Sequence, residues 1–226
     1  LKTSVKAVGS SPISKAYLVF NSIQTEGVCT VIPALEIRNI EDEEALKLCG
    51  AGIFVKDKLQ CCIDEFQTKS LSFINNKIKT GLLTIKISDQ SNQFISYEIY
   101  KSKTKRELLF EEDVLSVNII VETTVIIGEV ETKADFTKTQ EIEKIRQLLK
   151  KNLEEDLSRL IDTAQVKMKC DIFGIGPQIN RNYPEMWEKY KDDWDEIFKK
   201  LKINVECRIK INGSGISNKT AMGLEK

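Results

Sequence analysis

The sequence contains no histidine among its 226 residues, and this absence excludes several kinds of active site. Without histidine there can be no Ser–His or Cys–His nucleophilic pair, no HExxH zinc site and no other histidine-ligated metal. Because histidine is the commonest general base, its absence favours a non-enzymatic function. An enzyme with this sequence would need carboxylates, lysine or a bound metal. We expect no catalytic, cofactor-binding or metal-binding residues.

Net charge and long apolar runs are also missing. The 34 Lys and Arg residues balance 34 Asp and Glu, so no basic surface for nucleic acid is indicated. No apolar run approaches the roughly 20 residues of a transmembrane helix, and Leu1 opens no signal peptide. Only 11 Gly and 4 Pro accompany 41% hydrophobic residues, which excludes disordered and low-complexity classes.

Six cysteines are present without a CxxC pair: Cys29, Cys49, Cys61, Cys62, Cys170 and Cys207. The chain is long enough to bury a core, so we expect no disulfide framework. Cys207 lies on the apolar face of an alternating run and is expected to be buried and reduced. Cys61 and Cys62 should point to opposite faces of a strand, and a redox or metal role for them is the less favoured alternative.

The first half of the chain predicts short strands and one short helix. Residues 1–16 lack periodicity and predict a linker or tail. Asp64 is a plausible N-cap for a helix that reaches Asn75. The charged residues 101–113 have little to bury and predict a boundary between two domains, 1–112 and 113–226. Apolar runs predict strands over residues 17–23, 28–37, 46–55, 59–63, 82–87 and 94–100.

The second half carries the clearest periodicities. Alternation predicts strands over residues 117–127 and 202–211. Between them, apolar residues recur at helical spacing over residues 137–169, with Thr137 and Gln140 as a possible capping box. Core packing of this helix is favoured over a coiled coil, because the flanking strands need covering. The fold class is α+β: two domains, each a mixed or antiparallel sheet covered by helices, the second with one long amphipathic helix.

A glycine-containing segment follows the long helix. Gly174-x-Gly176 invites a phosphate-loop interpretation, but the segment follows a helix and Pro177 lacks an amide donor, which favours a simple turn. Asp171 in this segment is expected to bind loop amides or to pair with Arg181, and catalysis in a histidine-free hydrolase is the weaker alternative.

Pro184 is expected to open a further helix. Four residues at helical spacing would share one face of it: Trp187, Tyr190, Trp194 and Ile197. An aromatic stripe of this kind is more often part of a core than a binding platform, so we expect the two tryptophans to anchor the helix.

An ordered set of residues in this half resembles a known family. The set runs from Gln165 through the segment 170–176 and Arg181-Asn182-Tyr183-Pro184 to Trp187, Trp194 and Phe198. This order resembles the C-terminal domain of the spore germinant-receptor C subunit, the GerAC, GerBC and GerKC type of lipoprotein. The run from Gly50 to Leu59 and the pair Ile32-Pro33 are similar to that family's middle domain. The resemblance covers most of residues 27–215.

The resemblance implies a non-enzymatic receptor subunit, needed for the germination response to nutrients. Residues 1–112 would be the family's middle domain and residues 113–226 its C-terminal domain. The family's signal peptide, lipidated cysteine and first globular domain have no counterpart here, so a fragment is expected. The whole subunit would carry a lipid anchor (palmitate) on the outer face of the spore inner membrane. Its partners would be an A and a B membrane subunit. The alternative is a lipid-anchored or secreted small-ligand-binding module of another kind.

Overall fold

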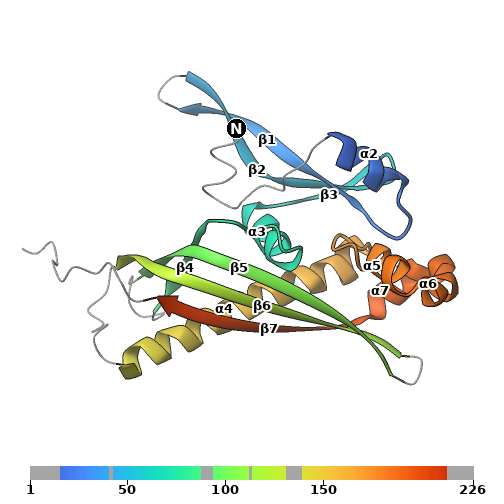
Figure 1. Cartoon of the computed structure of the whole chain (residues 1–226). Coiled ribbons are helices and arrows are strands. Elements are labelled where there is room, and N and C mark those ends of the chain that lie inside the picture. The colour runs from blue at the N-terminus through green and yellow to red at the C-terminus, as the bar shows by residue number, and fades with distance from the viewer. Residues whose placement is uncertain (1–15, 41–42, 88–93, 112–113, 131–138, 213–226) are drawn as a thin grey trace, which may run out of the picture.

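The computed structural model describes residues 16–40, 43–87, 94–111, 114–130 and 139–212, which form two sheets joined through helices (Figure 1). The first sheet is antiparallel, in the order β1-β2-β3. It is preceded by a short helix. These elements are α2 (Ala16–Gln24), β1 (Thr30–Ile40), β2 (Glu43–Val55) and β3 (Lys58–Ile63).

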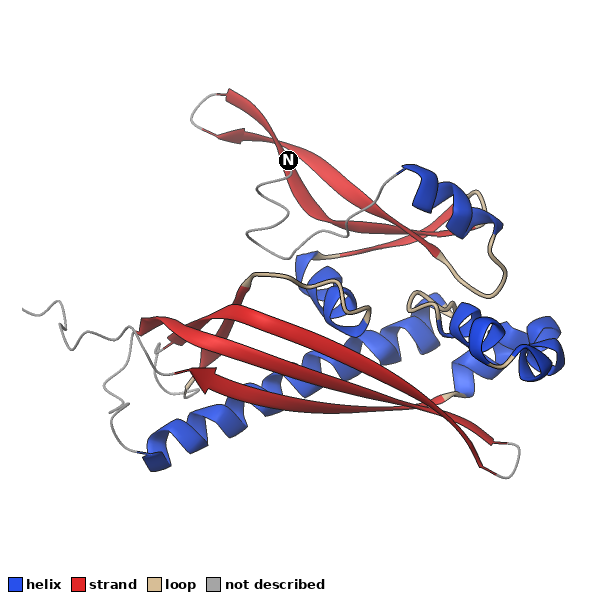
Figure 2. Ribbon diagram, viewed as in Figure 1, coloured by secondary structure: helices blue, strands red, loops and turns tan. Residues whose placement is uncertain are grey.

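The second sheet has the order β4-β5-β6-β7, and β7 runs parallel to β6 while the other pairs are antiparallel. Its strands are β4 (Leu82–Lys86), β5 (Phe94–Glu111), β6 (Val114–Val130) and β7 (Lys202–Asn212). Helix α4 (Thr139–Asp162) crosses one face of this sheet (Figure 2). Its apolar stripe is buried with the inward residues of β6 and β7, so the predicted core packing is confirmed and a free coiled coil is wrong.

Helix α3 (Glu65–Ile74) lies between the two sheets (Figure 2). Asp64 caps it as predicted: the Asp64 side chain accepts from the Gln67 backbone N–H at 2.8 Å, and the Gln67 side chain accepts from the Asp64 N–H at 3.2 Å. Its last residues, including Phe73 and Ile74, are buried. The helix therefore belongs to the core that joins the sheets.

A cluster of short helices closes the end of the molecule beyond α4 (Figure 1). Helix α4 continues as the π-helix η1 (Thr163–Met168), which ends at Lys169 in the left-handed conformation. The cluster consists of α5 (Ile175–Asn182), α6 (Pro184–Tyr190), the 3-10 turn η2 (Lys191–Asp193) and α7 (Trp194–Lys200). Pro184 opens α6 as predicted. The aromatic stripe lies on α6 and α7, not on one helix, yet both tryptophans face inward.

Two sequence predictions need correction here. Residues 17–23 belong to helix α2, not to a strand, because an apolar run without strict alternation does not distinguish the two structures. The domain boundary predicted between residues 112 and 113 falls between β5 and β6. These two strands are paired neighbours in one sheet, so the boundary does not separate the two sheets. Thr137 of the predicted capping box, and residues 1–15 of the predicted linker, lie outside the described residues.

Candidate functional site

The candidate site is built around the Asp171 loop, which we define as residues 169–174 between η1 and α5. Asp171 is only 2% exposed. Its Oδ1 accepts from the backbone N–H groups of Phe173 and Gly174, and its Oδ2 accepts from that of Gly176, each at 2.9 Å. The predicted bonds from Asp171 to loop amides are therefore confirmed. The amides that a bound phosphate would need are already occupied by this carboxylate.

The charge of Asp171 is balanced by a residue that the sequence did not indicate. Burial raises the pKa of Asp171 to about 6, while the amide donors and the guanidinium of Arg106 act in the opposite direction. Arg106, on β5, donates to the Phe173 carbonyl oxygen at 2.5 Å. Burial lowers the pKa of Arg106. Arg181, the partner considered from the sequence, is exposed.

The two tryptophans form the second part of the site. Trp187 and Trp194 are each 2% exposed and meet edge to face, with ring centroids 5.5 Å apart. The Trp194 indole N–H donates to the Gly27 carbonyl oxygen at 2.9 Å. The predicted anchoring role of both rings is confirmed, and the segment they hold is the one between α2 and β1.

Two glycines allow this close approach. Gly27 has φ +70°, and a Cβ there would overlap Cη2 of Trp187 and lie 3.0 Å from Cδ1 of Trp194. A Cβ at Gly176 would lie 2.8 Å from the Gly27 carbonyl oxygen. We call Gly27, Gly176, Trp187 and Trp194 the Trp junction. Together with the Cys29 N–H, which donates to the Asp171 carbonyl oxygen at 2.8 Å, it fixes the start of β1 to the helical cluster.

Sequence reasoning missed Arg106 and Gly27 as parts of this site. Arg106 lies in the charged stretch whose composition predicts a domain boundary, and Gly27 lies in a turn between two expected strands. Both reach the site only through tertiary contacts with residues far along the chain. A local pattern therefore carries no signal for either of them.

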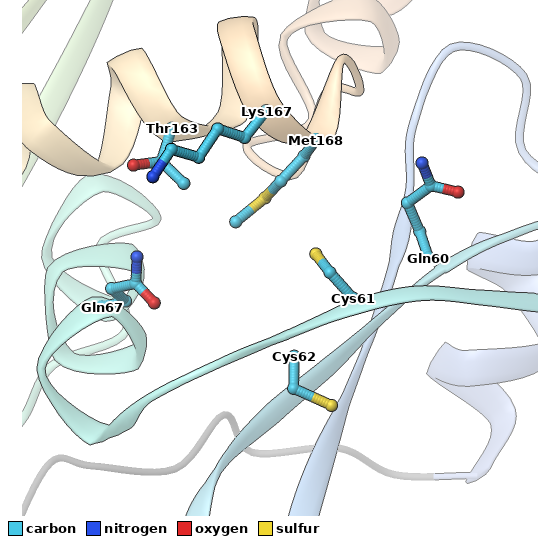
Figure 3. A pocket seen from close by; sticks show the side chains of 7 residues that line it. All are labelled: Gln60, Cys61, Cys62, Gln67, Thr163, Lys167 and Met168. Atoms are coloured by element: carbon cyan, nitrogen blue, oxygen red, sulfur yellow. The ribbon is translucent and has the colours of Figure 1, made fainter.

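A cavity of about 270 Å³ lies between β3, α3 and η1 (Figure 3). Its lining residues are Gln60, Cys61, Cys62, Gln67, Thr163, Lys167 and Met168. Cys61 points toward Met168, while Cys62 points the opposite way, as alternation along a strand predicted (Figure 3). Three of the lining residues belong to the π-helix, a conformation that is frequent at functional sites.

The six cysteines are free thiols in this structure. Cys207 is buried at 1% exposure, as predicted. Burial and the nearby Glu154 carboxylate raise the pKa of Cys207 to about 12, so it is protonated at neutral pH. Within the described ranges, no three histidine, cysteine, aspartate or glutamate side chains are grouped to hold a metal ion. In the same ranges, no helix combines the length and the apolar character needed to cross a membrane.

The fold and the site together define an α+β scaffold in which a buried carboxylate organises a loop and a pair of tryptophans clamps a distant segment. A family model described as "Spore germination B3/GerAC like, C-terminal" matches residues 49–215, most of the chain. The chain belongs to this family.

Individual relatives agree with the family match. Spore germination protein B3 of Bacillus subtilis (strain 168) is 28% identical over 188 residues, which are 81% of this chain and 49% of that protein. Spore germination protein KC of the same strain is 26% identical over 82% of this chain and 46% of its own length. The crystal structure of the GerBC protein matches with a TM-score of 0.71 and 25% identity, over 89% of this chain and 61% of that chain. The α+β fold is thus that of GerBC. The chain spans about half the length of the curated relatives that it matches.

Proposed function

We propose that this chain is part of a non-enzymatic subunit of a spore germinant receptor complex, needed for the germination response to nutrients. The observation that carries the proposal is the family match over residues 49–215. The names of the B3 and KC relatives and the likeness to GerBC support it. Such a subunit acts through its folded surface, so its residues serve mainly to build and present that surface.

The chemistry of the Asp171 loop supports the non-enzymatic part of the proposal. A catalytic carboxylate needs at least one oxygen that faces a substrate or water. Both oxygens of Asp171 accept backbone N–H groups inside the loop, and the side chain is buried. Histidine is absent from the sequence. The carboxylate is therefore placed to hold a loop in shape and to join it to β1.

The partners belong to the same proposal. An A and a B membrane subunit of the receptor would bind the folded chain, with no nucleic acid involved. The whole subunit would sit on the outer face of the spore inner membrane through a lipid anchor. Its support is the resemblance to the germinant-receptor C subunits, and the net charge of zero does not indicate a nucleic-acid partner.

The test uses the full-length protein in its own spores. Trp194→Ala removes the ring that holds Gly27, and Asp171→Asn removes one amide acceptor. We expect subunit abundance, co-purification with the A and B subunits, and germination to fall together in both variants. Arg181→Gln, at an exposed position, is the matched control and should change none of them. If Asp171→Asn keeps abundance and assembly but abolishes the response, Asp171 has a direct functional role and the scaffold interpretation is wrong.

A small-ligand-binding module is the second candidate, and the cavity between β3, α3 and η1 favours it. Its lining offers amide, hydroxyl and ammonium groups, from Gln60, Gln67, Thr163 and Lys167, suited to a small polar molecule. Titration calorimetry with the twenty amino acids and simple sugars tests this candidate. Saturable heat that disappears in Lys167→Ala, but not in the control Lys199→Ala on α7, would support it. Equal heats in both variants would refute it.

A further inference from the structure

Three cysteines converge where the first sheet meets the Asp171 loop. Cys29 directly precedes β1, Cys61 lies on β3, and Cys170 lies in the Asp171 loop. The side chain of Cys170 raises the pKa of the Cys29 thiol and, more weakly, that of the Cys61 thiol. Cys170 is therefore the thiol that the other two share as a neighbour.

The pair Cys29 and Cys170 is held together by the backbone as well. The Cys29 N–H donates to the carbonyl oxygen of Asp171, the residue next to Cys170, at 2.8 Å. The side chains are 8% and 4% exposed. A disulfide needs Cα atoms about 4.4–6.8 Å apart and side chains that face each other. The backbone contact places Cys29 beside Cys170, and the side chain of Cys170 acts on the Cys29 thiol, as expected for two side chains that face each other.

We propose that Cys29 and Cys170 form a disulfide that fastens the start of β1 to the Asp171 loop. Each thiol loses one proton and one electron, and a new sulfur–sulfur bond forms. A small-molecule disulfide, such as oxidised glutathione, accepts the two electrons and two protons and leaves as two thiols. A single bond between these residues is not the disulfide framework that the sequence argues against, and Cys207 remains outside it.

The surroundings of the pair determine when the bond can form. The interaction with the Cys170 side chain and burial both raise the pKa of Cys29, so the attacking thiolate is scarce in the folded chain. The exchange should therefore be slow in the folded protein and fast while the chain folds, when both thiols are accessible. The inference does not depend on the germination function.

The other cysteines make worse partners for Cys170. Cys61 points toward Met168 at the cavity (Figure 3), and no hydrogen bond of its backbone to the Asp171 loop is found among the described residues. Cys62 is exposed and points away from Cys61. Cys207 lies on β7, where its N–H donates to Glu154 at 2.8 Å. The geometry thus selects Cys29.

The bond would connect two segments that are distant in sequence. The Trp junction already holds Gly27, two residues before Cys29, through the Trp194 indole. A covalent bond beside it would prevent the start of β1 from leaving the helical cluster. The bond would also close a loop of more than 100 residues and so lower the entropy of the unfolded chain. The expected rise in the melting temperature of the protein is about 5–15 °C.

The experiment refolds the chain from urea in a glutathione redox buffer, using Cys49→Ser/Cys62→Ser as the background to remove two thiols that are not part of the pair. Free thiols are counted in denaturant with a maleimide polymer, and tryptic peptides are mapped by mass. We expect two of the four remaining thiols to be lost and a linked peptide pair containing Cys29 and Cys170. Dithiothreitol should reverse both changes and lower the melting temperature.

Two further variants make the test specific. Cys207→Ala removes a buried thiol away from the pair and should leave the linked peptide and the melting shift unchanged. Cys29→Ala should abolish both. Four free thiols after refolding in the oxidant would overturn the proposal, and so would a linked pair of Cys61 with Cys170. If Cys29→Ala does not fold, the peptide map of the background protein still decides between these outcomes.

Discussion

A methyl group at Gly27 tests the Trp junction directly. The residue has φ +70°, where an L side chain is strained, and its Cβ would overlap Cη2 of Trp187. The left-handed conformation costs a residue with a Cβ roughly 1–2 kcal/mol. Forcing an extra carbon into a packed site costs about 1–3 kcal/mol more. We therefore expect Gly27→Ala to lower the free energy of unfolding by about 2–5 kcal/mol.

Gly174 provides a matched control for the backbone part of this cost. Its φ is +71°, nearly that of Gly27, but the nearest atom to a new Cβ is Cγ2 of Val28 at 3.9 Å, an ordinary contact. Gly174→Ala should therefore cost only about 1–2 kcal/mol. The difference between the two variants isolates the contact with the tryptophans.

The assay is urea unfolding followed by tryptophan fluorescence, since both tryptophans lie at the junction. Trp187→Phe removes Cη2, so the double variant Gly27→Ala/Trp187→Phe should be more stable than the sum of the single effects predicts, by about 1 kcal/mol or more. If Gly27→Ala is no less stable than Gly174→Ala, or if the double variant is simply additive, the close packing at the junction is wrong.

Three further predictions follow from the same site and the core. Trp194→Ala should lower the free energy of unfolding by about 3–5 kcal/mol in a denaturant titration, and Trp194→Phe by clearly less; equal losses would contradict the role of the ring. The pKa of Asp171 is raised to about 6 in the folded chain, above the roughly 3.9 of an unfolded aspartate. At a pH between these two pKa values, the folded state therefore binds more protons than the unfolded state. Stability should thus fall by up to about 3 kcal/mol as the pH rises from about 4 to about 6, a slope that Asp171→Asn should lack. With its pKa at about 12, Cys207 should resist iodoacetamide in the folded chain at pH 8, whereas exposed Cys62 should react; equal alkylation rates would refute its burial.

Local chemistry made part of this structure predictable. The cap of α3 by Asp64 needs only four consecutive residues, and the buried faces of β6, β7 and α4 follow from their periods. The role of Asp171 was also predictable, since its amide donors lie within five residues of it. In each case the interacting groups are neighbours in the sequence or share one regular element.

Tertiary partners were not predictable in this way. Arg106 is hydrogen-bonded to Phe173, which lies 67 residues further along the chain. Gly27 is hydrogen-bonded to Trp194, which lies 167 residues further along. The strand predicted over residues 17–23 was wrong because an apolar run without a clear period does not distinguish a helix from a strand. In helix α2, Tyr17 and Phe20 are exposed.

The charged stretch taken for a domain boundary shows how one strand can carry two opposite signals. Along β5, Lys101, Lys103 and Lys105 are exposed and give the segment its linker-like composition. The alternate residues make tertiary contacts: the Thr104 hydroxyl donates to the Phe73 carbonyl oxygen of α3 at 2.6 Å, and Arg106 donates to the Asp171 loop. A strand with one solvated face need not be rich in apolar residues to be structural. Because residues 101–106 contact β6, α3 and the Asp171 loop, a domain boundary placed beside them would run through the core and not through a linker. The family match, which runs through this stretch without a break, agrees with that conclusion.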